Sequence, residues 1–143
     1  MPGPDECAVA REVGRLLAER GAVVLTGGLG GVMAAAVEGA SGAGGLTVGL
    51  LPGADRAAGN ASSVLVPTGL GELRNGLLVR SADAVIAVGG SWGTLSEVAL
   101  ARRGGVPVVC VGGWSVLDAS GVRVPLETAT NAADAVARVL QAE

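Results

Sequence analysis

The 143-residue sequence contains no histidine and no lysine, and it also lacks tyrosine and phenylalanine. Without histidine, the chain cannot build a Ser-His-Asp or Cys-His nucleophile system, nor a histidine metal site. Without lysine, it cannot form a Schiff base with pyridoxal phosphate or supply the lysine of a Walker A motif. Any chemistry must therefore use arginine, aspartate, glutamate, serine, threonine, backbone groups or the ligand itself.

Strong charge of one sign and long apolar runs are also missing. The net charge is −3 and the ten cationic residues are all scattered arginines, so no basic patch indicates nucleic-acid binding. The apolar runs 84–88 and 106–111 have the length of strands and are too short to span a membrane. The amino end lacks the basic and apolar regions of a secretion signal, so a cytoplasmic location is the default expectation.

Cysteine is scarce too, with Cys7 and Cys110 far apart in the sequence. Two such residues favour reduced thiols over a disulfide framework, and no metal site is expected. Cys110 lies inside an apolar strand pattern, which predicts an inert core position.

Strand-sized apolar runs alternate with helical patterns along residues 1–143, which predicts a single domain. We expect helices over 6–20, 71–81, 94–103 and 132–141, and a helix rich in glycine and alanine that follows the first glycine-rich turn and ends at about residue 43. Strands are expected over 22–26, 46–51, 84–88 and 106–111, and an extended piece over 63–66. Continuous apolar strands separated by helices indicate a parallel sheet covered on both faces, hence a three-layer α/β fold.

The first strand of such a fold is missing from this pattern. Doubly wound folds open with a buried strand before the first helix, and the segment Met-Pro-Gly-Pro-Asp at residues 1–5 cannot supply one. We therefore expect either that the sequence starts too late or that the sheet lacks a central strand. A sheet without its central strand would leave backbone N–H and C=O groups of the neighbouring strands unpaired.

Two glycine-rich turns, each between an apolar strand and a helix, are the most informative feature. The first, 26–33, contains Gly27, Gly28, Gly30 and Gly31, and the second runs through Gly89, Gly90, Ser91, Trp92, Gly93 and Thr94. Glycine lets a ligand approach the backbone, and the first N–H groups of a helix have no intrahelical partner and attract phosphate. Two such turns predict a nucleotide-like ligand across the edge of a parallel sheet.

The first turn matches a dinucleotide fingerprint only loosely. Met33 occupies the third glycine position, and the next strand ends in Leu50-Leu51-Pro52 without an acid for a ribose hydroxyl. This pattern disfavours a nicotinamide dehydrogenase. The alternative interpretation is that the glycines serve only tight packing between strand and helix.

Glu97 stands three residues after Thr94. This is the spacing of a capping box, in which the Glu97 carboxylate reaches back to the backbone N–H of Thr94. A carboxylate one turn into a helix beside a glycine-rich turn also suits catalysis. Spacing alone leaves both interpretations open.

Arg74 falls within the leucine-rich apolar stripe of the expected helix 71–81. An inward guanidinium is costly without an anionic partner, which could be Glu97, a bound phosphate or both. The alternative is a purely structural Arg–Glu ion pair. Arg80, at the edge of the stripe, is expected to be exposed.

Trp92 and Trp114 are the only aromatic residues, and both are expected just after strand ends on the ligand edge. Either indole could stack on a base, although indoles also favour subunit contacts. Asp83 precedes its strand at the opposite edge, which indicates a cap or turn residue.

Three segments together resemble the motifs of the Lonely Guy (LOG) family, long mislabelled as lysine decarboxylases. They are Leu73-Arg74-Asn75, then Asp83, then the run from Gly89 to Glu97. The family has an Arg-Lys pair on a helix, followed after the next strand by Pro-Gly-Gly-x-Gly-Thr-x-x-Glu. The turn 26–33 resembles the family's earlier Gly-Gly-Gly-x-x-Gly-Leu-Met. The similarity spans roughly residues 8–112 and is nearest to the branch with molybdenum-cofactor carrier proteins.

The resemblance implies a Rossmann-like homodimer that binds a nucleoside monophosphate or a similar phosphate-bearing ligand. Hydrolytic members release a free base and ribose 5′-phosphate, and Arg74 and Glu97 match the two residues to which catalysis is ascribed there. A carboxylate can stabilise the cationic sugar while orienting water, so neither metal nor cofactor is required. The implied ligand-binding residues are Gly27, Gly28, Gly30, Gly31, Met33, Asn75, Gly89, Gly90, Ser91, Trp92, Gly93 and Thr94.

Three departures separate the sequence from the hydrolases. Asn75 replaces their lysine, Gly89 their proline and Ser91 a glycine. Asn75 and Gly89 are usual in the carrier branch. The leading hypothesis is a nucleoside 5′-monophosphate phosphoribohydrolase, and the alternative is a non-catalytic carrier or sensor of molybdenum cofactor or a related ligand. A third interpretation is a structural remnant that binds nothing.

Overall fold

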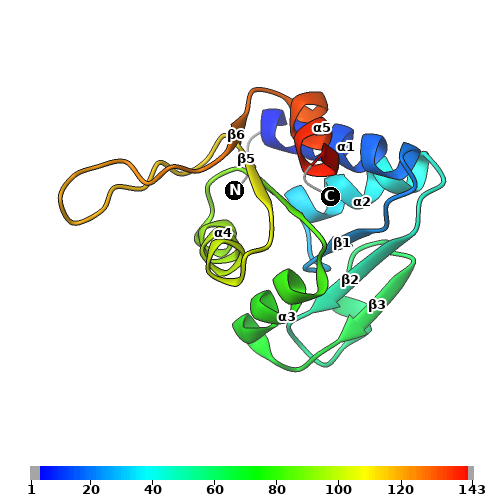
Figure 1. The fold of residues 1–143 in the computed structure, drawn as a ribbon. Helices are drawn as coiled ribbons and strands as arrows, with labels where there is room; N and C mark the ends of the chain where they lie inside the picture. Colours follow the sequence, from blue (N-terminus) through cyan, green and yellow to red (C-terminus); the bar gives the residue numbers. More distant parts are fainter. Residues whose placement is uncertain (1–3, 142–143) are drawn as a thin grey trace.

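The computed structural model describes residues 4–141, in which helices and parallel strands alternate (Figure 1). The helices are α1 (Pro4–Glu19), α2 (Val32–Gly42), α3 (Arg74–Ser81), α4 (Trp92–Gly104) and α5 (Ala132–Gln141). The strands are β1 (Val24–Thr26), β2 (Thr47–Leu51), β3 (Val64–Pro67), β4 (Val85–Val88), β5 (Val108–Val111) and β6 (Thr128–Ala129). Helices α1, α2 and α5 cover one side of the strands and α3 and α4 the other, which confirms the three-layer α/β fold.

The strands form two separate parallel sheets rather than one. Strand β2 pairs with β1 and β3, and strand β5 pairs with β4 and β6. Within residues 4–141, β1 and β4 are each paired on one side only. The centre of the expected sheet is therefore open, in agreement with the expected lack of a central strand. Pro4 and Asp5, from the segment judged unable to form a strand, belong to α1.

Strand β5 shows why its residues form a strand buried on both faces. Val108 and Cys110 pack with the buried side chains of α3 and α4. Val109 and Val111 point the other way and pack with α5. Side chains that alternate across a strand and are apolar on both faces need helices on both sides. Cys110 is buried, and Cys7 and Cys110 are both free thiols, as predicted.

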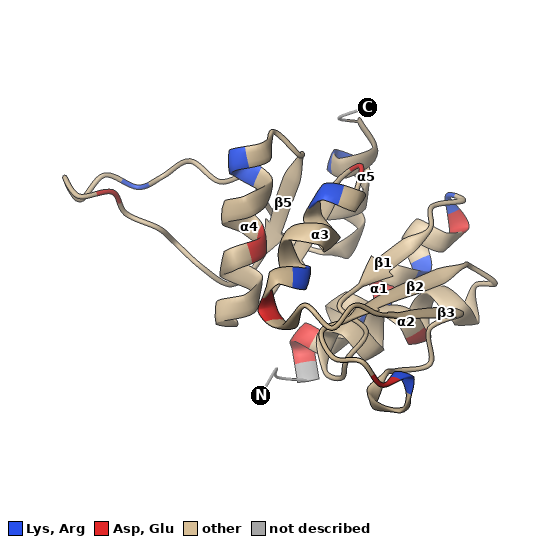
Figure 2. Cartoon of the chain, turned by 90° about the horizontal axis from the view of Figure 1, so that it is seen from below, with Lys and Arg blue, Asp and Glu red and all other residues tan. Residues whose placement is uncertain are grey.

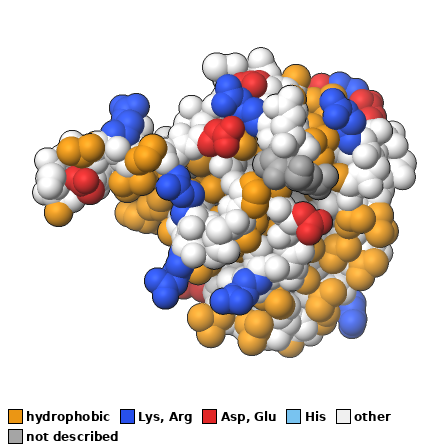
Figure 3. All heavy atoms as spheres, in the orientation of Figure 1, with side chains coloured by type: hydrophobic (Ala, Val, Ile, Leu, Met, Phe, Trp, Pro, Cys, Tyr) orange, Lys and Arg blue, Asp and Glu red, His pale blue; other side chains and the backbone are white. Residues whose placement is uncertain are grey.

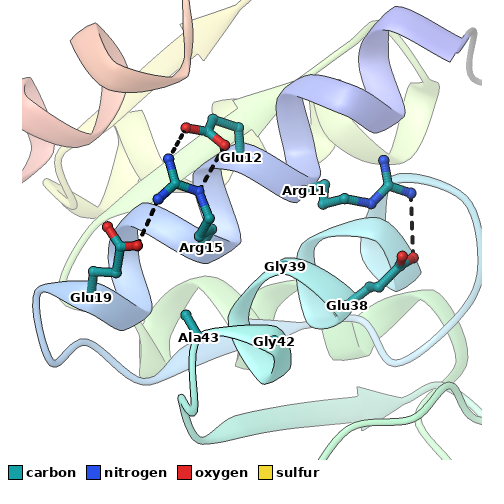
Figure 4. A pocket seen from close by; sticks show the side chains of 8 residues that line it. All are labelled: Arg11, Glu12, Arg15, Glu19, Glu38, Gly39, Gly42 and Ala43. Carbon is teal, nitrogen blue, oxygen red and sulfur yellow. Dashed lines mark hydrogen bonds and ion pairs between the residues drawn. The ribbon is translucent and has the colours of Figure 1, made fainter.

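Helices α1 and α2 approach each other very closely at two glycines. A Cβ on Gly14 would lie 2.0 Å from the carbonyl oxygen of Ala36, and a Cβ on Gly39 would lie 1.9 Å from that of Arg11. No other residue type fits either position without moving a helix. Exposed ion pairs flank this contact, including Arg11–Glu38 (Figure 4).

The segment between β5 and β6 projects from the body of the molecule (Figure 1). Backbone hydrogen bonds join its two arms, from the N–H of Val124 to the oxygen of Val116 and from that of Asp118 to the oxygen of Val122. Figure 3 shows hydrophobic side chains on this segment, where Leu117 and Val122 are each 61% exposed. Neither this segment nor β6 was predicted.

The expected helices and strands occur within a few residues of their predicted bounds, and the difference at the start of α4 has a clear cause. It begins at Trp92 rather than Thr94, because Ser91 is its N-cap. None of the helices within residues 4–141 combines the length and apolarity that crossing a membrane would need.

Candidate functional site

A cavity of about 1120 Å³ lies where the two sheets face each other. Its walls come from β1, β4 and the five helices, and both glycine-rich turns line it at the carboxyl ends of β1 and β4. Every site residue predicted from the sequence lines this cavity except Gly28, Gly89 and Trp92. The structure thus brings the two turns, Arg74 and Glu97 to one place.

The first turn, between β1 and α2, presents open backbone groups. Gly31 is the N-cap of α2 and offers no side chain to cap the helix, so the first N–H groups of α2 have no side-chain partner there. Gly30 and Gly31 are exposed, and a Cβ on Gly30 would meet no atom within 4 Å. Gly28 does not line the cavity. It has φ +79° and packs on Leu51, so it shapes the turn.

The second turn, between β4 and α4, supplies the N-cap of α4 from one of its own side chains, Ser91. The Ser91 hydroxyl accepts a hydrogen bond from the Thr94 N–H at 3.1 Å and lies 2.8 Å from the Thr94 hydroxyl. The capping interpretation of Glu97 is therefore wrong, because the cap is Ser91 and the third helical residue is Thr94. Glu97 lies farther into the helix, where its carboxylate lines the cavity.

Arg74 is 8% exposed, which confirms the inward orientation predicted from the leucine stripe. Its Nε donates to the carbonyl oxygen of Leu50 at 3.0 Å, its Nη2 to that of Gly27 at 3.3 Å, and its Nη1 to Asn75 Oδ1. A guanidinium has five N–H donors, so these bonds leave two N–H groups for a ligand. Arg80 is exposed, as predicted.

A direct ion pair between Arg74 and Glu97 is not present. The ion pairs shorter than 4.0 Å within residues 4–141 all lie on the surface, where they join residues of α1, α2 and α5 to one another or, in one case, Arg138 of α5 to Glu127. Helices α3 and α4 nevertheless lie side by side and each carries charged residues (Figure 2). The buried partners of Arg74 are backbone carbonyl oxygens at the ends of two strands, so the purely structural Arg–Glu pair is excluded as its explanation.

Asn75 links α3 and α4 at the wall of the cavity. Its Nδ2 donates to Ser96 Oγ at 3.1 Å, and Ser96 Oγ donates to the carbonyl oxygen of Gly93 at 2.7 Å. Since Asn75 also accepts from Arg74, one chain of hydrogen bonds runs from the guanidinium to the second turn. Asn75 thus fixes the position of Arg74 relative to α4.

Burial raises the pKa of the Glu97 carboxyl group, and the positive charge of Arg74 opposes this shift only in part. A half-buried carboxylate with a raised pKa beside an arginine is typical of a functional site. It is also the charged side chain of α4 that faces the cavity.

The raised pKa predicts a pH-dependent stability. The folded chain holds the Glu97 proton more tightly than the unfolded chain, so the stabilisation is complete below the ordinary value of 4.5 and is lost as pH rises through the raised pKa. We expect the free energy of unfolding of the native chain to fall relative to that of Glu97→Gln over this range. Urea denaturation of both chains at several pH values checks this, and a difference that is constant or of opposite sign would contradict it.

Glu6 is a site residue that the sequence did not indicate. It lies in the first turn of α1 and lines the cavity, and a Cβ on Gly89 would be 2.9 Å from its carboxyl carbon. Acidic residues are common in the first turn of any helix, so the position of Glu6 in the sequence does not indicate a functional role. Its carboxylate makes the second turn unfavourable for an anion.

The two tryptophans pack against each other at the rim. Their ring centroids are 4.8 Å apart, and Trp114 Nε1 donates to the carbonyl oxygen of Ser91 at 3.0 Å. Trp92 is 77% exposed, and neither ring is part of the cavity wall. Both lie just after strand ends, as expected.

Gly113 allows the turns after β4 and β5 to touch. It has φ +86°, and a Cβ there would lie 2.1 Å from the carbonyl oxygen of Gly89. This contact fixes the second turn next to the projecting segment.

The sequence pattern of the SLOG cluster4 family matches residues 1–141. The chain belongs to this family. It is 39% identical over 134 residues to an uncharacterized protein of Archaeoglobus fulgidus, a match that covers 90% of this chain and 89% of that one.

Solved structures agree with this assignment. The molybdenum cofactor binding protein of Rippkaea orientalis has a TM-score of 0.88 and 34% identity, over 99% of this chain and 90% of that one. The molybdenum cofactor carrier protein of Chlamydomonas reinhardtii has a TM-score of 0.83 and 36% identity, over 98% of this chain and 89% of that one. These similarities confirm the resemblance to the LOG superfamily and its molybdenum-cofactor-carrier-like branch.

Proposed function

We propose that this chain binds molybdenum cofactor, a phosphate-bearing pterin, and carries it unchanged. The observation that supports this most directly is the meeting of open backbone N–H groups of the first turn with the buried guanidinium of Arg74 in one cavity. The similarity to cofactor-binding proteins over nearly the whole chain supports this choice of ligand.

The phosphate group is assigned to the first turn rather than the second. At the second turn, Ser91 already occupies the N–H of Thr94 and the Glu6 carboxylate lies against Gly89. At the first turn, α2 begins without a side-chain cap, and Arg74 bonds the carbonyl oxygen of Gly27. A helix start supplies N–H donors and partial positive charge, and the guanidinium adds a full charge.

The residues present fit the rest of the ligand as well. Backbone groups of the glycine turns can meet the donors and acceptors along the edge of a pterin ring without side chains in the way. No group of three histidine, cysteine, aspartate or glutamate residues within the described part of the chain could hold a metal ion. Molybdenum would therefore stay on the sulfur atoms of the cofactor itself.

Purification from cells that make the cofactor tests this proposal. We expect molybdenum, measured by mass spectrometry, and pterin, measured by the fluorescence of its oxidation product, to co-purify with the folded chain. Anaerobic addition of the cofactor to the purified chain should restore any that was lost. A cooperatively folded chain that retains neither component under both conditions would contradict it.

A second candidate is hydrolysis of a nucleoside 5′-monophosphate, which the placement of Glu97 favours. The C–N bond to the base breaks, and the Glu97 carboxylate stabilises the cationic sugar and orients a water molecule. The water oxygen bonds to the anomeric carbon and one of its protons goes to the base nitrogen, so free base and ribose 5′-phosphate leave. If this is the activity, adenine release from AMP should fall at least about 100-fold in Glu97→Gln. Absence of adenine release from any purine monophosphate would exclude this candidate and leave the carrier proposal intact.

We also propose a homodimer, as the family resemblance implies. The exposed Leu117 and Val122 of the projecting segment are apolar surface that a second copy could cover. Sedimentation equilibrium gives the mass directly, and a monomer at micromolar concentration would contradict the dimer.

A further inference from the structure

The first glycine-rich turn is bound by the loop between β2 and β3 through one residue, Asn60. The backbone N–H of Asn60 donates to the carbonyl oxygen of Gly28 at 2.8 Å. Its side-chain Nδ2 donates to the carbonyl oxygen of Leu29 at 2.9 Å. Asn60 therefore occupies two successive carbonyl oxygens of the turn.

The Asn60 side chain is fixed in the orientation that this contact requires. Its Oδ1 accepts hydrogen bonds from the backbone N–H of Ser62 at 3.0 Å and from Ser62 Oγ. A backbone N–H can only donate and a carbonyl oxygen can only accept, so the amide oxygen of Asn60 must face Ser62 and its nitrogen must face Leu29. The loop also packs closely on the sheet, because a Cβ on Gly49 of β2 would lie 3.1 Å from Ser62 Oγ.

The preceding peptide unit of the turn has protein partners on both sides. The carbonyl oxygen of Gly27 accepts from Arg74 Nη2 at 3.3 Å, and the N–H of Gly28 donates to Thr26 Oγ1 at 3.1 Å. The carbonyl oxygens of residues 27–29 are therefore all bound by donors of the protein. Oxygens held in this way do not turn toward a ligand.

The N–H groups of the next two peptide units point the other way. In a trans peptide, the carbonyl oxygen of one residue and the N–H of the next point in opposite directions. Since Asn60 binds the oxygens of Gly28 and Leu29, the N–H groups of Leu29 and Gly30 point away from Asn60. Neither N–H donates to another protein group among residues 4–141. Gly30 lines the cavity, and Asn60 does not.

We propose that Asn60 is the positioning residue of the phosphate site. It binds two carbonyl oxygens so that the N–H groups of Leu29 and Gly30 face the phosphate group, as successive backbone N–H groups do in anion-binding turns. The Asn60 side chain orients the N–H of Gly30, and its backbone N–H orients that of Leu29. This inference rests on the proposed function, because it assumes a phosphate group at the first turn.

Two substitutions in the loop test this role. Asn60→Ala removes the side-chain bond to Leu29 and keeps the backbone bond to Gly28. Ser62→Ala is the matched control, because it removes a hydroxyl from the same loop and keeps the bond between Asn60 and Leu29. Both variants and the native chain are titrated anaerobically with molybdenum cofactor and with its dephosphorylated form, and separately with inorganic phosphate. Amide chemical shifts of Leu29 and Gly30 follow the binding.

We expect Asn60→Ala to lower the affinities for the phosphorylated cofactor and for inorganic phosphate at least about tenfold, because one N–H of the site loses its orientation. Its affinity for the dephosphorylated cofactor should stay within about twofold, as should all affinities of Ser62→Ala. The shift that phosphate causes at Gly30 should decrease more than the shift at Leu29. A residue that only stabilises the loop would instead weaken both forms of the cofactor alike.

Unchanged affinity of Asn60→Ala for both phosphate-bearing probes would overturn the proposal, as would an equal loss for the two forms of the cofactor. If Asn60→Ala does not unfold cooperatively in urea, Asn60→Ser replaces it, because the serine hydroxyl is one bond shorter than the amide and does not reach Leu29. Failure of the carrier function has a different signature, namely that the native chain binds neither form of the cofactor. Inorganic phosphate then decides the role of Asn60, which is overturned if the native chain and the variant bind it equally or not at all.

Discussion

Gly39→Ala is expected to lower the free energy of unfolding by about 3 kcal/mol, because the added methyl group has no room. A Cβ at this position would lie 1.9 Å from the carbonyl oxygen of Arg11, so α1 and α2 must separate. Helix α2 carries the first glycine-rich turn at its amino end and α1 lines the cavity, so the change affects the site as well as the core.

Gly42→Ala in the same helix is the matched control. A Cβ at Gly42 meets nothing within 4 Å, so the change should leave stability unchanged or raise it by up to about 1 kcal/mol through better helix propensity. Urea denaturation followed by circular dichroism measures both chains. Equal midpoints for the two variants would show that α1 and α2 are not in close contact at Gly39.

Gly30→Asp is expected to lower the affinity for molybdenum cofactor at least about 100-fold while the chain stays folded. The new Cβ meets no atom within 4 Å, so the fold tolerates the side chain. Its carboxylate, however, stands at the open start of α2, where the phosphate group is proposed to bind. Like charges placed together in a binding site cost several kcal/mol, or a factor of about 100 and more.

Gly30→Ala is the control that distinguishes the effect of the added charge on affinity from the effect of the added side-chain volume. It adds the same Cβ without the carboxylate and should retain affinity within about tenfold. Anaerobic titration with the cofactor, followed through the fluorescence of the two tryptophans near the rim, gives both affinities. Equal affinities for Gly30→Asp and the native chain would show that the phosphate group does not bind at the first turn.

Much of the fold and part of the site follow from local patterns in the sequence. Continuous apolar runs such as 108–111 predict strands buried on both faces, and the structure has β5 there with helices on each side. The position of Arg74 within a leucine stripe predicts its burial, which is confirmed. The alternation of strand and helix places both glycine-rich turns at one edge, which the cavity also confirms.

Other features depend on tertiary contacts that no local pattern contains. Ser91 and Thr94 are both good capping residues, and only the path of the chain decides that Ser91 is the cap. The carbonyl oxygens of Leu50 and Gly27 become partners of Arg74 because two strand ends meet α3. The segment from β5 to β6 and the two-residue β6 are too irregular for a periodic signal.

The structure and the similar proteins reverse the order of the two candidate functions. Sequence reasoning placed the hydrolase first, on the spacing of Arg74 and Glu97. The structure engages Arg74 with backbone oxygens, and the similar solved structures include cofactor carriers. Asn75, which differs from the hydrolases, belongs to the network that holds Arg74 in place. These observations favour the carrier.

Backbone amide chemical shifts of the ¹⁵N-labelled chain test the central claim most directly, namely that open N–H groups of the first turn bind a phosphate. The chain is titrated anaerobically with molybdenum cofactor and with its dephosphorylated form. We predict that the amides of residues 30–33 shift with the phosphorylated form alone. Identical shifts with both forms, or shifts confined to residues 90–94 of the second turn, would contradict the account.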